Sequence, residues 1–166
     1  EAFRRRFGIE GPFLLYVGRV DLNKGCPELF DHFQRYRRET SSNLTLVLVG
    51  RAVLEVPKVE AIKALGFLDD ASKWNALDAC MALAIPSRLE SLSMATLEAF
   101  HAERPVVANG NCAVLRGQCR RSGGGLYYAN YDEFRGVLET LEGDPALRAR
   151  MGRAGRAYFD RHYSWP

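Results

Sequence analysis

Short apolar runs alternate with amphipathic segments along most of the chain. The continuous apolar runs at residues 13–18 and 44–50 each end in glycine, a pattern typical of strands that are buried on both faces. Shorter runs predict further strands near residues 62–67, 81–86, 104–109 and 125–130. Strands of this kind, separated by other segments at regular intervals, favour a parallel sheet.

The segments between the strands carry a helical period. In residues 26–40, Pro27 stands at a first helical position and is followed by an apolar stripe of Leu29, Phe30, Phe33 and Tyr36. The pattern predicts further helices over residues 70–80, 93–103, 131–142 and 145–163. Together these elements predict an α/β fold, with a Rossmann-like parallel sheet and helices on both faces.

Two connections are expected to lack a full helix. Residues 51–61 are few and contain Pro57, so the crossover there is abbreviated. Residues 109–124 are expected to form a loop, which carries two cysteines and three arginines: Cys112, Cys119, Arg116, Arg120 and Arg121. Solvation is the default role for these arginines, and contact with phosphate or an acidic lipid surface is the alternative.

Composition narrows the class of protein. The 166 residues suit one domain over 1–166 with a single core, and the net charge of +3 is too small and dispersed to indicate nucleic acid. Four cysteines without a C-x-x-C motif or a histidine pair favour reduced thiols over zinc. No membrane-length apolar stretch or secretory signal is found, so we expect a cytoplasmic protein that can lie at the inner membrane face.

Several polar residues are expected to have structural roles, with contact to phosphate as the alternative for Arg88 and support of Glu98 as the alternative for His101. The cluster Arg4 to Arg6 predicts a solvated helix face, Arg88 an ion pair, and His101 a helix-packing histidine. Surface positions are expected for His32 and His162, and core or edge positions for Tyr127, Tyr128 and Tyr131.

Ligands of open parallel sheets bind outside the carboxyl ends of the strands. Glycines and charged residues collect after the predicted strands here: Arg19 and Lys24 lie between Gly18 and Gly25 after the first. Arginine as a forked donor and lysine as a point charge suit a diphosphate. The alternative is a solvated turn with a helix cap, and Asp21 favours a turn in both cases.

Glu90 and Glu98 stand eight residues apart around a helix start at which Ser91 or Ser93 can cap. Glu98 lies roughly 8 Å along the helix from Ser93. A sugar nucleotide has a similar length, with its diphosphate at the helix start, its ribose at Glu98 and its hexose at Glu90. Alternatively, Glu90 is a cap and Glu98 a surface residue, although the neighbouring Leu97–Phe100 segment indicates a mostly buried helix, where an idle carboxylate is costly.

The segments YVGRVDLNKG, LVLVG, LGFLDD, PSRLESLSMATLEAF and RPVVANGNC follow one another in a familiar order. In this order the chain resembles, over nearly its whole length, the C-terminal donor-binding half of retaining GT-B glycosyltransferases of family four. The most specific parts of the resemblance are Arg19 with Lys24, and the Glu90–Glu98 pair.

The resemblance implies a role for each of these residues. Arg19 and Lys24 would bind the donor diphosphate and stabilise the leaving nucleotide, and Glu90 would contact the hexose near its reacting face. Glu98 would hold the ribose hydroxyls. The remaining donor contacts would come mostly from backbone groups of Gly18, Ser91, Leu92, Ser93 and Met94, with the nucleobase beside Arg51, Gly66 and Phe67.

The resemblance also implies what surrounds the site. The chain has no Asp-x-Asp signature, so we expect no metal or other cofactor beside the nucleotide-sugar donor substrate. The acceptor, a glycan, lipid or small molecule, would bind a second, N-terminal domain that this chain lacks. We therefore expect hexosyl transfer in glycan or polysaccharide biosynthesis by the full-length protein, and no transfer by this domain alone.

Three departures from the family pattern stand out. Ser91-Leu92-Ser93 replaces the commoner Gly-Phe-Gly, a change expected to be mild, and Glu103 stands where a helix-ending glycine is more usual. The loop after the fifth strand lacks the commoner Gly-Gly-x-x-Glu pattern, so its role stays open.

A non-catalytic nucleotide or nucleotide-sugar binding module remains the alternative function. A nicotinamide-dependent dehydrogenase is set aside because no G-x-G-x-x-G follows the first strand.

Overall fold

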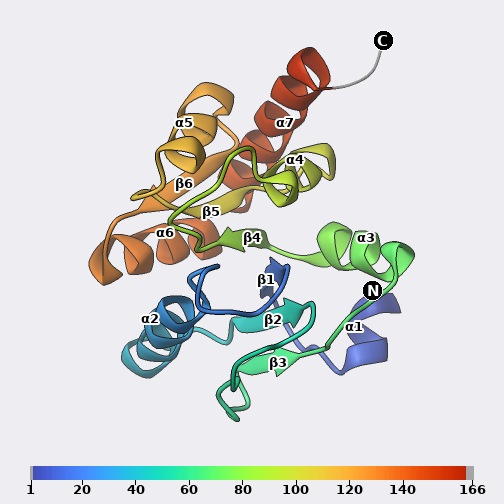
Figure 1. Cartoon of the computed structure of the whole chain (residues 1–166), viewed down its shortest axis with the longest axis vertical. Coiled ribbons are helices and arrows are strands. Elements are labelled where there is room, and N and C mark those ends of the chain that lie inside the picture. The colour runs from blue at the N-terminus through green and yellow to red at the C-terminus, as the bar shows by residue number, and fades with distance from the viewer. Residues whose placement is uncertain (1, 164–166) are drawn as a thin grey trace.

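A computed structural model, which describes residues 2–163, shows six strands in one sheet with the order β3-β2-β1-β4-β5-β6 (Figure 1). Every neighbouring pair of strands is parallel, which confirms the predicted fold class. The strands are β1 (Phe13–Val17), β2 (Thr45–Val49), β3 (Ile62–Ala64), β4 (Ala82–Ile85), β5 (Val106–Asn109) and β6 (Gly125–Tyr128). The helices are α1 (Ala2–Phe7), α2 (Cys26–Glu39), α3 (Asp70–Ala79), α4 (Met94–His101), α5 (Ala113–Ser122), α6 (Tyr131–Gly143) and α7 (Pro145–His162).

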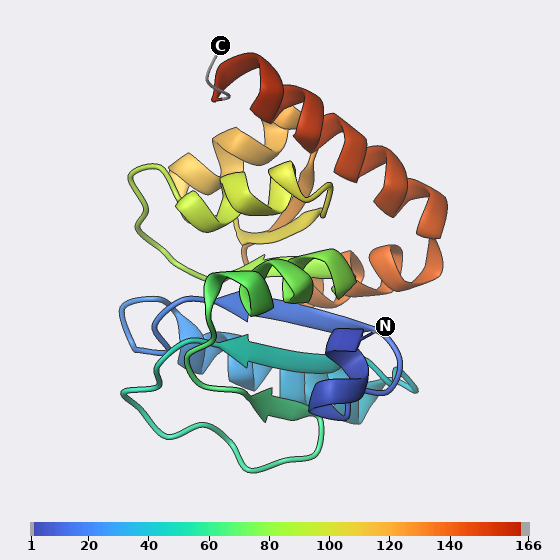
Figure 2. The same cartoon turned by 90° about the vertical axis from the view of Figure 1, so that its right-hand side faces the viewer.

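The sheet separates two hydrophobic cores. In β1, Leu14 and Tyr16 pack into the core beneath α2 and α6, while Phe13 and Leu15 pack into the opposite core beneath α1, α3, α4 and α5. This alternation explains why β1 reads as a continuous apolar run, since both of its faces are covered. In Figure 2, α2 lies behind the strands and α1 and α3 lie in front of them. Within residues 2–163, no helix is both long and apolar enough to cross a membrane.

Residues 113–122 form α5, so the prediction of a loop there is wrong. The buried residues Cys112, Leu115 and Cys119 recur at helical spacing and pack against the sheet, and Gly123 ends the helix in a left-handed conformation with φ 65°. The stripe is difficult to see in the sequence because two of its three members are cysteines. Buried cysteines pack as small apolar residues, and all four cysteines here are buried and free.

Other structural predictions have mixed outcomes. Arg4 is not part of a solvated face, because its guanidinium donates to the carbonyls of Gly11 at 2.8 Å and Ala79 at 3.0 Å and so ties α1 to α3. The abbreviated crossover between β2 and β3 is confirmed, since no helix lies between them. Tyr128 and Tyr131 are buried and Tyr127 lies half-exposed on the edge strand β6, as predicted.

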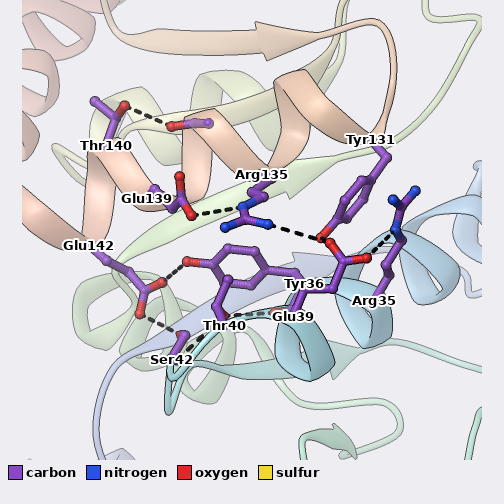
Figure 3. Close-up of polar contacts among 11 residues, drawn as sticks. Arg35, Tyr36, Glu39, Thr40, Ser42, Tyr131, Arg135, Glu139, Thr140 and Glu142 are labelled. Atoms are coloured by element: carbon purple, nitrogen blue, oxygen red, sulfur yellow. Dashed lines mark hydrogen bonds and ion pairs between the residues drawn. The ribbon is translucent and has the colours of Figure 1, made fainter.

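A polar cluster joins α2 to α6 on one face of the sheet (Figure 3). The carboxylate of Glu142 accepts hydrogen bonds from the hydroxyls of Tyr36 and Ser42, the latter at 2.7 Å. In a second contact between α2 and α6, the Tyr131 hydroxyl donates to the Glu39 carboxylate at 2.9 Å. Each tyrosine hydroxyl thus donates to a glutamate of the other helix. The buried tyrosine rings pack against the core, and their polar ends have hydrogen-bond partners.

His32 packs beside this cluster, so its predicted surface position is wrong. Its ring lies 6.0 Å from that of Tyr128, 5.8 Å from that of Tyr131 and 5.4 Å from that of Phe134. Burial lowers the pKa of His32 below its ordinary value of 6.5, although the nearby carboxylates of Glu28 and Asp31 act in the opposite direction and Arg35 adds to the lowering. By contrast, His162 is exposed, as predicted.

The lowered pKa of His32 predicts how stability depends on pH. The unfolded chain takes up the proton near pH 6.5 and the folded chain only at lower pH. The free energy of unfolding should therefore be constant with respect to this group above about pH 7 and should decrease as pH falls towards about 5. Urea unfolding of wild type and His32→Gln at several pH values checks this. A slope between pH 7 and 5 that is equal in the two proteins contradicts the assignment.

Gly18 and Gly50 end β1 and β2 and lie in direct contact at the carboxyl edge of the sheet. Gly50 has φ 142°, and a Cβ atom at this position would stand 1.9 Å from the carbonyl oxygen of Gly18. We expect Gly50→Ala to destabilise the fold by about 3 kcal/mol, because the backbone of both strand ends would have to move. Gly66→Ala is the control: Gly66 also has positive φ, at 71°, but open space around it, so urea unfolding should show a loss of only about 1 kcal/mol. Equal losses would contradict the close-approach argument.

Candidate donor-binding site

The strand order reverses between β1 and β4, and the loops that follow these two strands carry most of the candidate residues. In Figure 2 the strand arrows point to the left-hand side, where these loops project. The crevice at such a reversal is the usual ligand site of an open parallel sheet. The structure therefore brings the loop after β1 and the loop after β4 to the place where the topology leaves a crevice.

Asp21 organises the loop after β1. Its carboxylate, on a residue that is only 5% exposed, accepts the backbone N–H of Lys24 at 2.8 Å and also contacts the Arg19 guanidinium. The hydrogen bond from the Lys24 backbone and the contact with Arg19 hold the pKa of Asp21 below its ordinary value. The Tyr16 hydroxyl donates to the Arg19 carbonyl at 2.6 Å. The two predicted cations, Arg19 and Lys24, thus stand on a loop whose conformation is fixed by hydrogen bonds to Asp21 and Tyr16.

Lys24 and Glu90 meet across the crevice. Lys24 Nζ lies 3.2 Å from Glu90 Oε1, and these side chains are 42% and 15% exposed respectively. Both line a cavity of about 310 Å³ that is bounded by the ends of β1 and β4 and the start of α4. Seven predicted site residues line it: Gly18, Lys24, Glu90, Ser91, Leu92, Ser93 and Met94. A cation and a carboxylate therefore face the same space from two different loops.

Ser93 begins α4 in an unusual conformation. Its hydroxyl caps the helix by accepting the Thr96 N–H at 3.4 Å, whereas Ser91 is exposed and precedes the cap. Ser93 has φ 61°, in the left-handed region that disfavours residues with a Cβ atom by about 1–2 kcal/mol. Serine thus holds here a conformation that glycine adopts without strain, and the expectation that the Ser-Leu-Ser replacement is mild for binding stays a prediction. Glu103, in the other predicted glycine-like position, has φ 55°.

Glu98 faces a second, adjoining groove. Its Oε1 lies 2.8 Å from Lys73 Nζ of α3, and the Glu98 side chain is 24% exposed, so it is neither a free surface residue nor unpaired. The hydrogen bond that Lys73 donates to Glu98 raises the pKa of Lys73. The groove has a volume of about 590 Å³ and shares Leu92 and Met94 with the smaller cavity. Lys73 was missed in the sequence because a lone lysine in a helix carries no sign of its partner.

The residues predicted to lie near a nucleobase form a different edge of the same rim. Arg51 is exposed, and its backbone carbonyl accepts the Val20 N–H at 2.9 Å. The Gly50 N–H donates to the Gly66 carbonyl at 2.8 Å, which fixes the turn before Phe67, whose side chain is 83% exposed. Arg19, Arg51, Gly66 and Phe67 do not line the 310 Å³ cavity, so their part in binding stays a prediction.

Three other residues, namely Arg88, His101 and Arg116, have structural partners. Arg88 lies 2.7 Å from Glu28 Oε2, which confirms the predicted ion pair. His101 packs its ring against Trp74 at 5.6 Å and Phe159 at 5.1 Å, in keeping with a helix-packing histidine. Arg116 of α5 donates to the Gly110 carbonyl at 2.8 Å.

Solved structures define the fold more closely. The C-terminal domain of LpcC, a glycosyl transferase group 1 family protein from Francisella tularensis, matches 99% of this chain and 93% of that chain with a TM-score of 0.79 at 17% identity. HepE from Anabaena, solved in complex with UDP-glucose, matches 98% of this chain and 48% of that chain with a TM-score of 0.82 at 19% identity. The fold is that of the C-terminal domain of GT-B glycosyltransferases.

The sequence model of the glycosyl transferases group 1 matches residues 1–158, and the chain belongs to this family. Glycogen synthase of Mycobacterium tuberculosis (strain CDC 1551 / Oshkosh) is 29% identical over 170 residues, which cover 92% of this chain and 39% of that protein. The chain thus spans well under half the length of this curated relative.

Proposed function

We propose that this chain is the nucleotide-sugar donor-binding domain of a retaining glycosyltransferase, which transfers a hexosyl group to an acceptor in glycan or polysaccharide biosynthesis. The observation that carries the proposal is the meeting of Lys24 and Glu90 at 3.2 Å in a cavity at the start of α4. The Lys24 ammonium can bind a diphosphate, and the Glu90 carboxylate beside it can accept hydrogen bonds from sugar hydroxyls. The acceptor would bind a further domain of the full-length protein.

The proposed chemistry needs a stabilised leaving group. The bond between the anomeric carbon and the diphosphate oxygen breaks, and the oxygen keeps the electron pair. The acceptor hydroxyl oxygen bonds to the anomeric carbon, and its proton passes to the departing diphosphate oxygen. Arg19, Lys24 and the free N–H groups at the start of α4 would stabilise the negative charge on the departing diphosphate. Glu90 would hold the hexose close to the carbon that reacts.

The charged side chains of the candidate site are paired with one another. Arg19 contacts Asp21, Lys24 contacts Glu90, and Lys73 contacts Glu98. A bound diphosphate would compete with Glu90 for Lys24, and this exchange would leave the Glu90 carboxylate free to accept from a sugar hydroxyl. The pairs keep the cations oriented without a ligand, which reduces the ordering cost of binding.

Calorimetric titration with UDP-, GDP- and ADP-sugars tests the proposal directly. One nucleotide sugar should bind selectively, and Glu90→Ala should lose at least tenfold of that affinity. The plain nucleoside diphosphate should bind Glu90→Ala as well as wild type or better, because Lys24 is then released from its carboxylate partner. Glu28→Ala is the control, since it removes a carboxylate from an ion pair outside the cavity. Binding of no nucleotide sugar by wild type would reject the proposed function.

A further inference from the structure

Gln118 of α5 is an unexpected residue in the core behind the donor loop. It is 1% exposed, and its Nε2 donates to the backbone carbonyl of Leu92 at 2.6 Å. Its Oε1 is buried and has no hydrogen-bond partner. Glutamine is seldom fully buried, and an unsatisfied buried oxygen is costly, so stability alone favours an apolar residue of similar size here.

The hydrogen bond from the Gln118 side chain goes to Leu92, the residue before the strained Ser93. Ser93 holds φ 61° with a side chain present, a conformation that persists only where surrounding contacts determine it. On one side of the strain, the Ser93 hydroxyl bonds to the amide and hydroxyl of Thr96. On the other side, the Leu92 carbonyl is held by Gln118. The loop is therefore fixed at both flanks of its strained residue.

We propose that Gln118 is a positioning residue for the donor-binding loop 91–94. By holding the Leu92 carbonyl towards α5, it turns the Ser93 N–H of the same peptide unit away from α5 and keeps Ser93, which lines the cavity, in its left-handed conformation. The role rests on the proposed function, because it concerns the loop that would receive the sugar and diphosphate. This role explains why a glutamine stands in the core although its Oε1 lacks a partner, because Nε2 alone holds the loop.

Gln118→Met tests the role with a side chain of similar length, no donor and no change of charge. Nucleotide-sugar affinity should fall about tenfold, while the midpoint of thermal unfolding should stay the same or rise. Gln34→Met is the matched control, because the Gln34 amide donates only to Phe30 of its own helix at 3.2 Å. Unchanged affinity in Gln118→Met would overturn the proposal.

Rescue by a second substitution separates positioning from general damage. Glycine adopts the left-handed region freely and is an acceptable helix cap, so Ser93→Gly should keep the loop in place without help from Gln118. The double variant Gln118→Met with Ser93→Gly should bind within about threefold of wild type. A double variant as weak as Gln118→Met would overturn the proposal.

Amide hydrogen exchange supplies a readout that needs no ligand. The Leu97 N–H, which donates to the backbone carbonyl of Ser93 and keeps this acceptor in Ser93→Gly, should exchange faster in Gln118→Met and slowly again in the double variant. If wild type bound no nucleotide sugar while exchange responded in this way, the proposed function would fail and the loop-positioning role would stand. If wild type bound a nucleotide sugar and Gln118→Met changed neither affinity nor exchange, the reverse would hold.

Discussion

Replacing Lys24 with methionine is expected to weaken binding of a nucleoside diphosphate by roughly 10- to 150-fold, the effect of losing a hydrogen bond to a charged group. The loss has two sources. The diphosphate loses a cation, and Glu90, whose side chain is only 15% exposed and pairs with Lys24 at 3.2 Å, is left as an uncompensated negative charge beside it. Calorimetry at low and moderate salt measures the effect, which should shrink as salt rises.

The second source can be isolated with Glu90. Adding Glu90→Gln to Lys24→Met should recover part of the diphosphate affinity, because the repelling carboxylate is gone. Lys63→Met is the matched control: it removes the same charge from β3, where Lys63 Nζ donates to the Gly8 carbonyl and Lys63 does not line the 310 Å³ cavity. If Lys63→Met weakened binding as much as Lys24→Met, net charge and not the site would account for the result.

Replacing Glu98 with glutamine should cost a similar factor, roughly 10- to 150-fold, but only for ligands that carry ribose hydroxyls. The Lys73 ammonium donates to Glu98 Oε1 at 2.8 Å and so orients the carboxylate, which leaves Oε2 to accept from a ribose. Affinity should be compared for a nucleoside diphosphate and its 2′,3′-dideoxy analogue. Wild type should prefer the hydroxylated ligand, and Glu98→Gln should lose that preference.

Lys73→Met should show the same pattern with a smaller loss, since Glu98 remains present but is no longer held. Asp70→Asn is the control, because Asp70 is the other carboxylate near Lys73, at 3.6 Å, and its side chain is 92% exposed. This variant should leave the preference for ribose hydroxyls unchanged. An equal loss of affinity for the dideoxy analogue in Glu98→Gln would show that Glu98 does not read the ribose.

Local patterns in the sequence predicted most of the fold. Residues 13–18 and 44–50 are apolar throughout because both faces of β1 and β2 are covered, and this burial is visible residue by residue. The α5 helix was missed because its buried stripe consists of Cys112, Leu115 and Cys119, and cysteine is a weak marker of helical periodicity. His32 was misplaced for a related reason, since its packing partners lie on β6 and α6.

Local sequence patterns suffice to predict the sheet, the rim on which the candidate residues stand and the residue types that suit a diphosphate and sugar hydroxyls. Each of these follows from residues close together in the chain. Only the tertiary structure decided which charges meet, that Ser93 is strained, and that Gln118 reaches Leu92. The partners in these contacts are 25 to 66 residues apart. Hydrogen bonds and ion pairs of this kind depend on how the helices and strands pack, and local periodicity carries no information about that packing.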